Sequence, residues 1–140
     1  MWDTTELKAR FSGAENAAVV QYLEEQHPSA HSDVAEEMLI ASEGIKDRHY
    51  HCPNGMQCSY IFLHTRDGVI YSLAVGMKTL GFRLPKQEVQ NALAEGGEIF
   101  SELGDHWVSF NPFRVDEPTV KTRARMKRWC ESAYRFACLI

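Results

Sequence analysis

One short segment of the chain gathers histidine and cysteine side chains. Within ten residues it holds His49, His51, Cys52 and Cys58. Imidazole and thiolate are the ligands that zinc prefers, so this composition invites a metal site. The spacing contains no Cys-x-x-Cys pair, and the adjacent His51 and Cys52 diverge in an extended chain. We therefore predict a polar loop with no metal or other cofactor, and keep as an alternative a small metal-binding enzyme using these four residues.

Other nucleophiles and bases have no partners that the sequence can assign. Cys130 and Cys138 lie on or near the apolar face of a predicted C-terminal helix, where small buried thiols are common. His64 lies inside a predicted strand, and no Ser-His-Asp arrangement can be argued around it. The chain also has no Gly-x-Ser-x-Gly turn, phosphate-binding glycine loop or His-Glu-x-x-His pair. We expect a protein that is not an enzyme.

Carboxylates recur in small groups, and we predict two acidic patches that bind a partner. Paired carboxylates can perform acid–base chemistry, but on polar helix faces they usually provide solubility. An exposed acidic face also attracts a basic partner and accelerates association. Trp107 is a candidate aromatic anchor for such an interface, although it also suits a core position. The first predicted patch consists of Glu24, Glu25, Asp33, Glu36 and Glu37, and the second of Glu98, Glu102 and Asp105.

Basic residues concentrate at the other end of the chain. Residues 1–50 carry four basic and ten acidic groups, whereas residues 121–140 carry six basic groups and one acidic group. The basic groups of this last segment are Lys121, Arg123, Arg125, Lys127, Arg128 and Arg135. We favour a solvated amphipathic helix that pairs with the acidic N-terminal half over a helix that grips nucleic-acid phosphates.

Apolar periodicity predicts the elements that must position these groups. Leu7 and Phe11 are one helical turn apart, and a second helix is expected to end before Pro28. A third helix is predicted from Val34 to Ile45, with Asp33 and Glu36 at the spacing of a capping box. Further helices follow Pro85 and Pro118, the last with an almost continuous i, i+3, i+4, i+7 apolar face.

The middle of the chain changes to the period of β-strands. Strands are predicted at residues 60–65, 69–75, 80–84 and 107–110. The step Asp67-Gly68 between the first two favours a hairpin with a type I′ turn. Together these patterns predict an α+β domain, in which an antiparallel β-meander of about four strands packs with N-terminal and C-terminal helices.

Length and composition bound the remaining possibilities. A chain of 140 residues that is 44% hydrophobic and 24% charged is expected to form a single domain, residues 1–140. Its formal net charge of −4 argues against a general nucleic-acid binder. No apolar run is long enough to span a bilayer, and the N-terminal residues lack the features of a secretory signal. We expect a cytoplasmic protein with reduced thiols and no membrane contact.

Two stretches of the chain resemble a family. They are Tyr60-Ile61-Phe62-Leu63-His64-Thr65-Arg66-Asp67-Gly68 through Val75-Gly76-Met77-Lys78 to Phe82-Arg83-Leu84-Pro85, and Leu103-Gly104-Asp105-His106-Trp107 with the later Trp129. In their sequence pattern these stretches resemble bacterial immunity proteins that are encoded beside polymorphic or contact-delivered toxins, of the type VI secretion or Rhs type. The resemblance implies a non-enzymatic toxin inhibitor acting in interbacterial competition, an antitoxin that occludes a toxin acting in the cytoplasm.

The sequence thus predicts a function through protein–protein interaction. The expected partner is a cognate toxin domain, not a nucleic acid or a membrane, and we expect no small-molecule ligand. An adaptor or chaperone specific for a secreted effector is a further alternative. Such a chaperone and an immunity protein differ in outcome, because loss of the chaperone abolishes effector delivery, whereas loss of immunity is lethal only when an active toxin is present.

Overall fold

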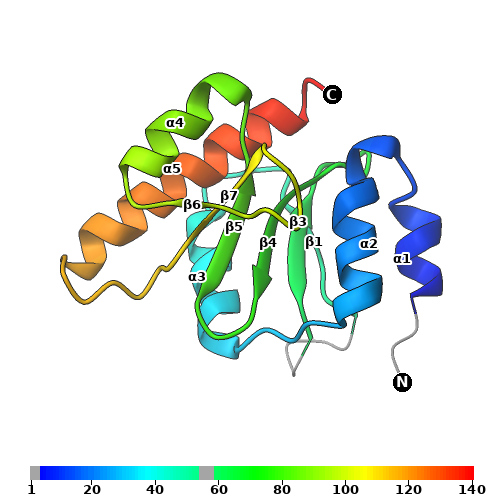
Figure 1. Ribbon diagram of the computed structural model, residues 1–140, viewed down its shortest axis with the longest axis horizontal. Coiled ribbons are helices and arrows are strands. Elements are labelled where there is room, and N and C mark those ends of the chain that lie inside the picture. Colours follow the sequence, from blue (N-terminus) through cyan, green and yellow to red (C-terminus); the bar gives the residue numbers. More distant parts are fainter. Residues whose placement is uncertain (1–3, 54–58) are drawn as a thin grey trace.

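The computed structural model describes residues 4–53 and 59–140, and it is an α+β fold in which helices cover both faces of one antiparallel sheet (Figure 1). The helices are α1 (Thr5–Arg10), the 3₁₀ turn η1 (Ala14–Asn16), α2 (Ala17–Gln26), α3 (Ser32–Ala41), α4 (Lys86–Ala94) and α5 (Thr119–Ala137). The strands are β1 (His49–His51), β3 (Ile61–His64), β4 (Ile70–Val75), β5 (Thr79–Arg83), β6 (Glu98–Ile99) and β7 (Trp107–Phe110). The predicted fold class is therefore confirmed.

The sheet has six strands in the order β1-β3-β4-β5-β7-β6, and every neighbouring pair is antiparallel. The four predicted strands form its centre. The two additional strands lie at its edges, and one of them, β1, occupies the segment 49–51 for which we predicted a loop. That prediction was wrong because β1 pairs with β3 through its backbone, which a polar side-chain sequence does not exclude.

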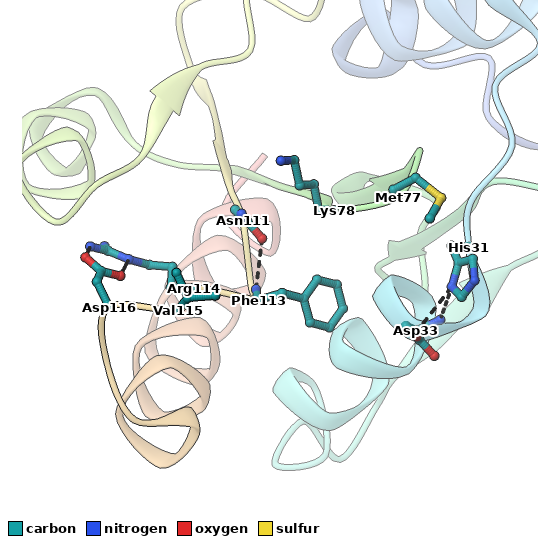
Figure 2. A pocket seen from close by; sticks show the side chains of 9 residues that line it. All are labelled: His31, Asp33, Met77, Lys78, Asn111, Phe113, Arg114, Val115 and Asp116. Atoms are coloured by element: carbon teal, nitrogen blue, oxygen red, sulfur yellow. Dashed lines mark hydrogen bonds and ion pairs between the residues drawn. The ribbon is translucent and has the colours of Figure 1, made fainter.

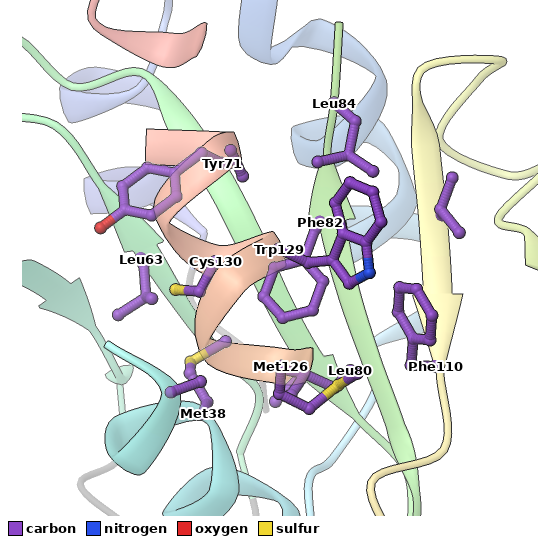
Figure 3. Packing of buried hydrophobic residues seen from close by; sticks show 14 of the residues in the cluster. Met38, Leu63, Tyr71, Leu80, Phe82, Leu84, Phe110, Met126, Trp129 and Cys130 are labelled. Carbon is purple, nitrogen blue, oxygen red and sulfur yellow. The ribbon is translucent and has the colours of Figure 1, made fainter. Parts of the chain in front are cut away.

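Two hydrophobic clusters lie on opposite faces of the sheet. One cluster packs α3, α4 and α5 against the sheet, with Met38, Trp129 and Cys130 among its members (Figure 3). The other packs α1 and α2 against it through residues such as Leu7 and Leu23. All residues of β3 and β4 are buried, which explains why their sequences are continuously apolar instead of alternating.

The structure differs from two local predictions, the start of α3 and the turn between β3 and β4. The N-cap of α3 is His31, whose Nδ1 accepts a hydrogen bond from the Asp33 amide at 3.1 Å, so Asp33 lies within the first turn instead of capping it. The predicted β3–β4 hairpin is present, but only Gly68 of its Asp67-Gly68 step has a positive φ, at 88°. A type I′ turn needs positive φ at both residues, so the turn type was wrong.

Candidate protein-interaction surface

An open groove of about 600 Å³ lies at the end of the sheet where three connections meet (Figure 2). Its walls come from the first turn of α3, the β4–β5 turn and residues 111–116 between β7 and α5. The lining residues are His31, Asp33, Met77, Lys78, Asn111, Phe113, Arg114, Val115 and Asp116. We call this the 77/113/115 groove, after its three apolar side chains.

Backbone pairing fixes the wall that carries Met77. Gly76 donates a hydrogen bond from its N–H to the Ser29 carbonyl at 2.6 Å, and its carbonyl accepts one from the His31 amide at 2.8 Å. Gly76 has a φ of 66°, a conformation that glycine adopts at little cost. These bonds join the α2–α3 connection to the β4–β5 turn, so Met77 projects from a held turn.

Side-chain hydrogen bonds fix the opposite wall. The Asn111 carboxamide oxygen accepts from the Phe113 amide at 2.9 Å, which is the geometry of an Asx turn. The Arg114 guanidinium donates from Nε to Asp116 Oδ1 at 2.9 Å and reaches the Glu95 carbonyl at 3.5 Å. The paired guanidinium holds the pKa of Asp116 below its usual value. Phe113 and Val115 are thereby presented on a segment that is tied down.

The groove exposes apolar surface. Met77 is 67% exposed, Phe113 39% and Val115 102%, and the Phe113 ring projects into the space between its own segment and α3 (Figure 2). Large apolar side chains that gather in solvent, with polar groups at the rim, are typical of protein-binding surfaces. The rim here combines the Lys78 ammonium, the Asp33 carboxylate and the Arg114–Asp116 pair.

The structure divides the first predicted acidic patch between two layers. Glu24 and Glu25 lie on α2, whereas Asp33, Glu36 and Glu37 lie on α3, across the sheet. Glu24 pairs with Lys8 at 2.8 Å, and Glu25 accepts a hydrogen bond from Gln21. Of the predicted residues, Asp33 alone lines the groove, with Glu36 exposed on the same helix.

Glu37 is not available to a partner. Its residue is 7% exposed, and its carboxylate accepts two hydrogen bonds from the Arg123 guanidinium, at 3.1 and 2.7 Å. The pair joins α3 to α5, which confirms that the basic helix is partly neutralised by the acidic N-terminal half. Other guanidiniums of α5 pair with acids outside that half: Arg125 with Glu117, and Arg128 with Glu95 at 2.7 Å.

The second predicted patch lies beside α2. Glu98, Glu102 and Asp105 are exposed around the connection from β6 to β7. The ring of Tyr22 on α2 contacts Phe100 edge-on at 5.5 Å between centroids, and burial together with the Glu102 carboxylate raises the pKa of Tyr22. Glu102 therefore lies near α2, on the opposite face of the sheet from α3.

Trp107 is a core residue. It is 3% exposed and packs in the cluster beneath α1 and α2, as its alternative interpretation expected, so it cannot serve as an exposed anchor. The large apolar side chains exposed in the groove are Met77, Phe113 and Val115, which sequence reasoning missed. Their signal was weak: Phe113 and Val115 lie in an aperiodic segment between Pro112 and Pro118, and Met77 follows a strand-ending glycine.

The pairing of β1 decides where the side chains of the histidine–cysteine segment lie. His49 and His51 share one face of β1, and His49 Nε2 lies 3.0 Å from Asp47 Oδ1. Cys52 contacts the Ser59 hydroxyl at 3.5 Å, and Cys58 lies outside the described residues. Among residues 4–53 and 59–140 there is no group of three or more His, Cys, Asp or Glu side chains arranged to hold a metal ion.

Two further observations concern the described chain as a whole. Cys130 and Cys138 are free thiols, and burial raises the pKa of Cys130 to about 12. None of the helices in the described ranges is both long and apolar enough to cross a membrane. Comparisons with family profiles, with curated proteins and with solved structures found no match to this chain.

Proposed function

We propose that this protein is a non-enzymatic inhibitor that binds a cognate bacterial toxin, as an immunity protein does, and that the 77/113/115 groove is its contact surface. The observation that carries the proposal is the gathering of three exposed apolar side chains on a groove whose walls are held by hydrogen bonds. A surface held in one conformation before binding loses little entropy when a partner docks.

The charge around the groove supports a protein partner. Asp33 and Lys78 lie at its rim, and the Arg114–Asp116 pair closes one end. Apolar anchors surrounded by polar groups of both signs are the arrangement of a typical protein–protein interface, in which a few central side chains supply most of the binding free energy. The acidic residues of α3, Asp33 and Glu36, are the members of the predicted patch that this surface retains.

The test is co-expression with the product of the open reading frame that neighbours this chain's gene. We expect the neighbouring product to arrest growth alone, and the chain to restore growth and to co-purify with that product. A Met77→Asp/Val115→Asp double variant places two carboxylates on the apolar floor and is expected to weaken binding at least about tenfold, measured by calorimetry. Leu139→Asp is the matched control, since Leu139 is 84% exposed and lies outside the groove.

Each outcome has a distinct meaning. If the neighbouring product is harmless and does not bind the chain, the inhibitor proposal is wrong. If it binds but the groove variant binds as well as the control, the contact surface lies elsewhere. If the product binds and is harmless, and deleting this chain abolishes its secretion, the protein is an effector chaperone.

A further inference from the structure

Three histidines lie together on one face of the sheet beneath α1. His49 and His64 are paired residues of β1 and β3, and His51 pairs with Phe62, so all four side chains project to the same side. The rings of His49 and His64 stack with centroids 5.5 Å apart, and the His51 ring lies 5.1 Å from that of Phe62. His51 is 7% exposed and His64 5%.

Phe11, the residue that follows α1, closes this group from above. Its ring meets those of His51, Phe62 and His64 edge-on, at centroid distances of 5.3, 4.9 and 4.9 Å. Phe11 and Leu7 are the buried side chains that hold α1 on the sheet. A helix of six residues is not stable alone, so α1 depends on this packing.

The hydrogen bonding of His64 fixes its protonation state in the closed arrangement. Its Nδ1 lies 2.8 Å from the Thr65 carbonyl, which accepts only, so Nδ1 carries the proton of the neutral ring. Its Nε2 is buried with no hydrogen-bond partner among the described residues. A second proton on Nε2 would place a charged N–H in a buried position without an acceptor among the described residues.

The surrounding charges do little to offset this penalty. Arg10 of α1, His49 and His51 all disfavour a charge on His64, and the carboxylate of Asp47 is hydrogen-bonded to His49. Glu6 of α1 favours a charge on His51, and Arg10 opposes it. Burial is the largest cause in both cases, and it lowers the pKa of His51 and of His64.

Residues 12–16 connect α1 and Phe11 to the rest of the molecule. Asn16 is buried and ties η1 to the β3–β4 hairpin: its amide donates to the Gly68 carbonyl at 2.7 Å, and its oxygen accepts from the Ile70 amide at 2.9 Å. The Asn16 amide also donates to the Phe11 carbonyl, at 3.4 Å, a long hydrogen bond that breaks when α1 leaves the sheet. Ser12 and Gly13 lie between these two residues. The Lys8–Glu24 ion pair joins α1 to α2, and it is weak because the Lys8 side chain is exposed and that of Glu24 is partly exposed.

We propose that His51 and His64 form a pH-dependent latch for α1. At neutral pH the uncharged rings hold Phe11, and in mild acid their protonation releases residues 5–11 from the sheet while the rest of the fold stays closed. Above the ordinary histidine pKa of about 6.5 both rings are neutral in either state, so the latch is fully closed. As the pH falls below that value, His51 and His64 bind protons at a higher pH in the open state than in the closed state. Protonation therefore favours the open state.

The experiment measures amide hydrogen exchange of the whole chain at pH 7.5 and pH 5.0, with labelling times scaled to equal intrinsic exchange. We expect the amides of α1 to open about tenfold more at pH 5.0. The amides of α5 are expected to keep their protection. Equal protection of α1 at both pH values would overturn the proposal, and so would an equal loss in α1 and α5, which is global unfolding.

Two variants link the effect to the two rings. The substitution His51→Phe preserves a ring that contacts Phe11 and Phe62. In His64→Asn the asparagine can still donate a hydrogen bond to the Thr65 carbonyl. The double variant His51→Phe/His64→Asn is therefore expected to keep α1 protected at pH 5.0. The control is His27→Asn, at a left-handed cap that asparagine tolerates. The control should lose α1 protection at pH 5.0 as the native chain does. If the control keeps α1 protected and the double variant loses that protection, the latch proposal is wrong.

A measurement on the native protein does not depend on the folding of any variant. In a proton NMR titration, the imidazole signals of His51 and His64 are expected to shift in the same pH range in which the Phe11 ring signals move to positions typical of solvent. If the two histidines titrate while the Phe11 signals stay unchanged, the rings do not control α1.

Discussion

Asn16 is the residue on which the N-terminal layer depends most directly. Its side chain is 1% exposed and satisfies the backbone of two residues in the β3–β4 hairpin, the Gly68 carbonyl and the Ile70 amide. The sequence does not mark this asparagine as structurally important, because its partners in the hairpin lie more than fifty residues away along the chain. A buried polar side chain of this kind specifies how two segments join as well as stabilising them.

Removing that side chain should be costly. We expect Asn16→Ala to lower the free energy of unfolding by about 2–3 kcal/mol, because two buried backbone groups lose their partners. Urea unfolding at pH 7.5 measures the effect. Asn91→Ala, on the exposed face of α4, is the matched control and should change stability by less than about 0.5 kcal/mol. Equal effects of the two substitutions would contradict the role of Asn16.

At the scale of elements, the central hairpin differs from the edges of the sheet. β3 and β4 are buried on both faces, whereas β1 and β6 are edge strands of three and two residues. Tyr50 and Ile99, in these edge strands, are exposed. Local opening follows burial and pairing, so the two kinds of strand should differ in stability.

We therefore expect a hierarchy of amide exchange across the sheet. Hydrogen-bonded amides of β3 and β4 should exchange only through global unfolding, and those of β1 and β6 through local opening, at least about tenfold faster. NMR-detected exchange at pH 7.5, where the latch is closed, measures both. Protection of β1 as strong as that of β4 would show that the edge is covered.

The elements also show how far the sequence was informative. Long apolar periods predicted the central strands and the later helices, because side-chain burial sets those periods. The strands β1 and β6 were not predicted, because short edge strands are held by backbone pairing, which leaves little periodicity in the side chains. The prediction of the first acidic patch was wrong for a different reason. Glu25 and Asp33 are close in the sequence, but the path of the chain places α2 and α3 on opposite faces of the sheet.

At the scale of the whole molecule, charge is neutralised internally to a large extent. Three arginines of α5 pair with Glu37, Glu95 and Glu117, which lie on α3, after α4 and before α5. The acidic surface of α2 remains apart from this network, since α2 covers the other face of the sheet. Of these three carboxylates only Glu37 comes from the acidic N-terminal half, so the two ends of the sequence neutralise each other in part.

This pairing predicts how the protein responds to a polyanion. A Glu37→Gln/Glu117→Gln variant removes the carboxylate that pairs with Arg123 and leaves Arg125 with Glu95 alone, and we expect it to elute from heparin at higher salt than the native chain. Glu25→Gln/Glu98→Gln is the control, because it changes the net charge equally at two exposed carboxylates that do not pair with the arginines of α5 in the described residues. We expect the control to shift less than half as far, and equal shifts would show that net charge alone decides.

The covering of β3 and β4 from both sides imposes an order on folding during synthesis. The helices of one layer, α1 and α2, leave the ribosome before the hairpin, so that face can be buried as soon as the strands emerge. The other face needs α5, which is made after every strand of the sheet. Until then only α3 and α4 cover this face, and the part that α5 buries, including the Tyr71 ring that contacts Tyr134, stays exposed. Exposed apolar surface of this kind makes a partly folded chain prone to aggregation.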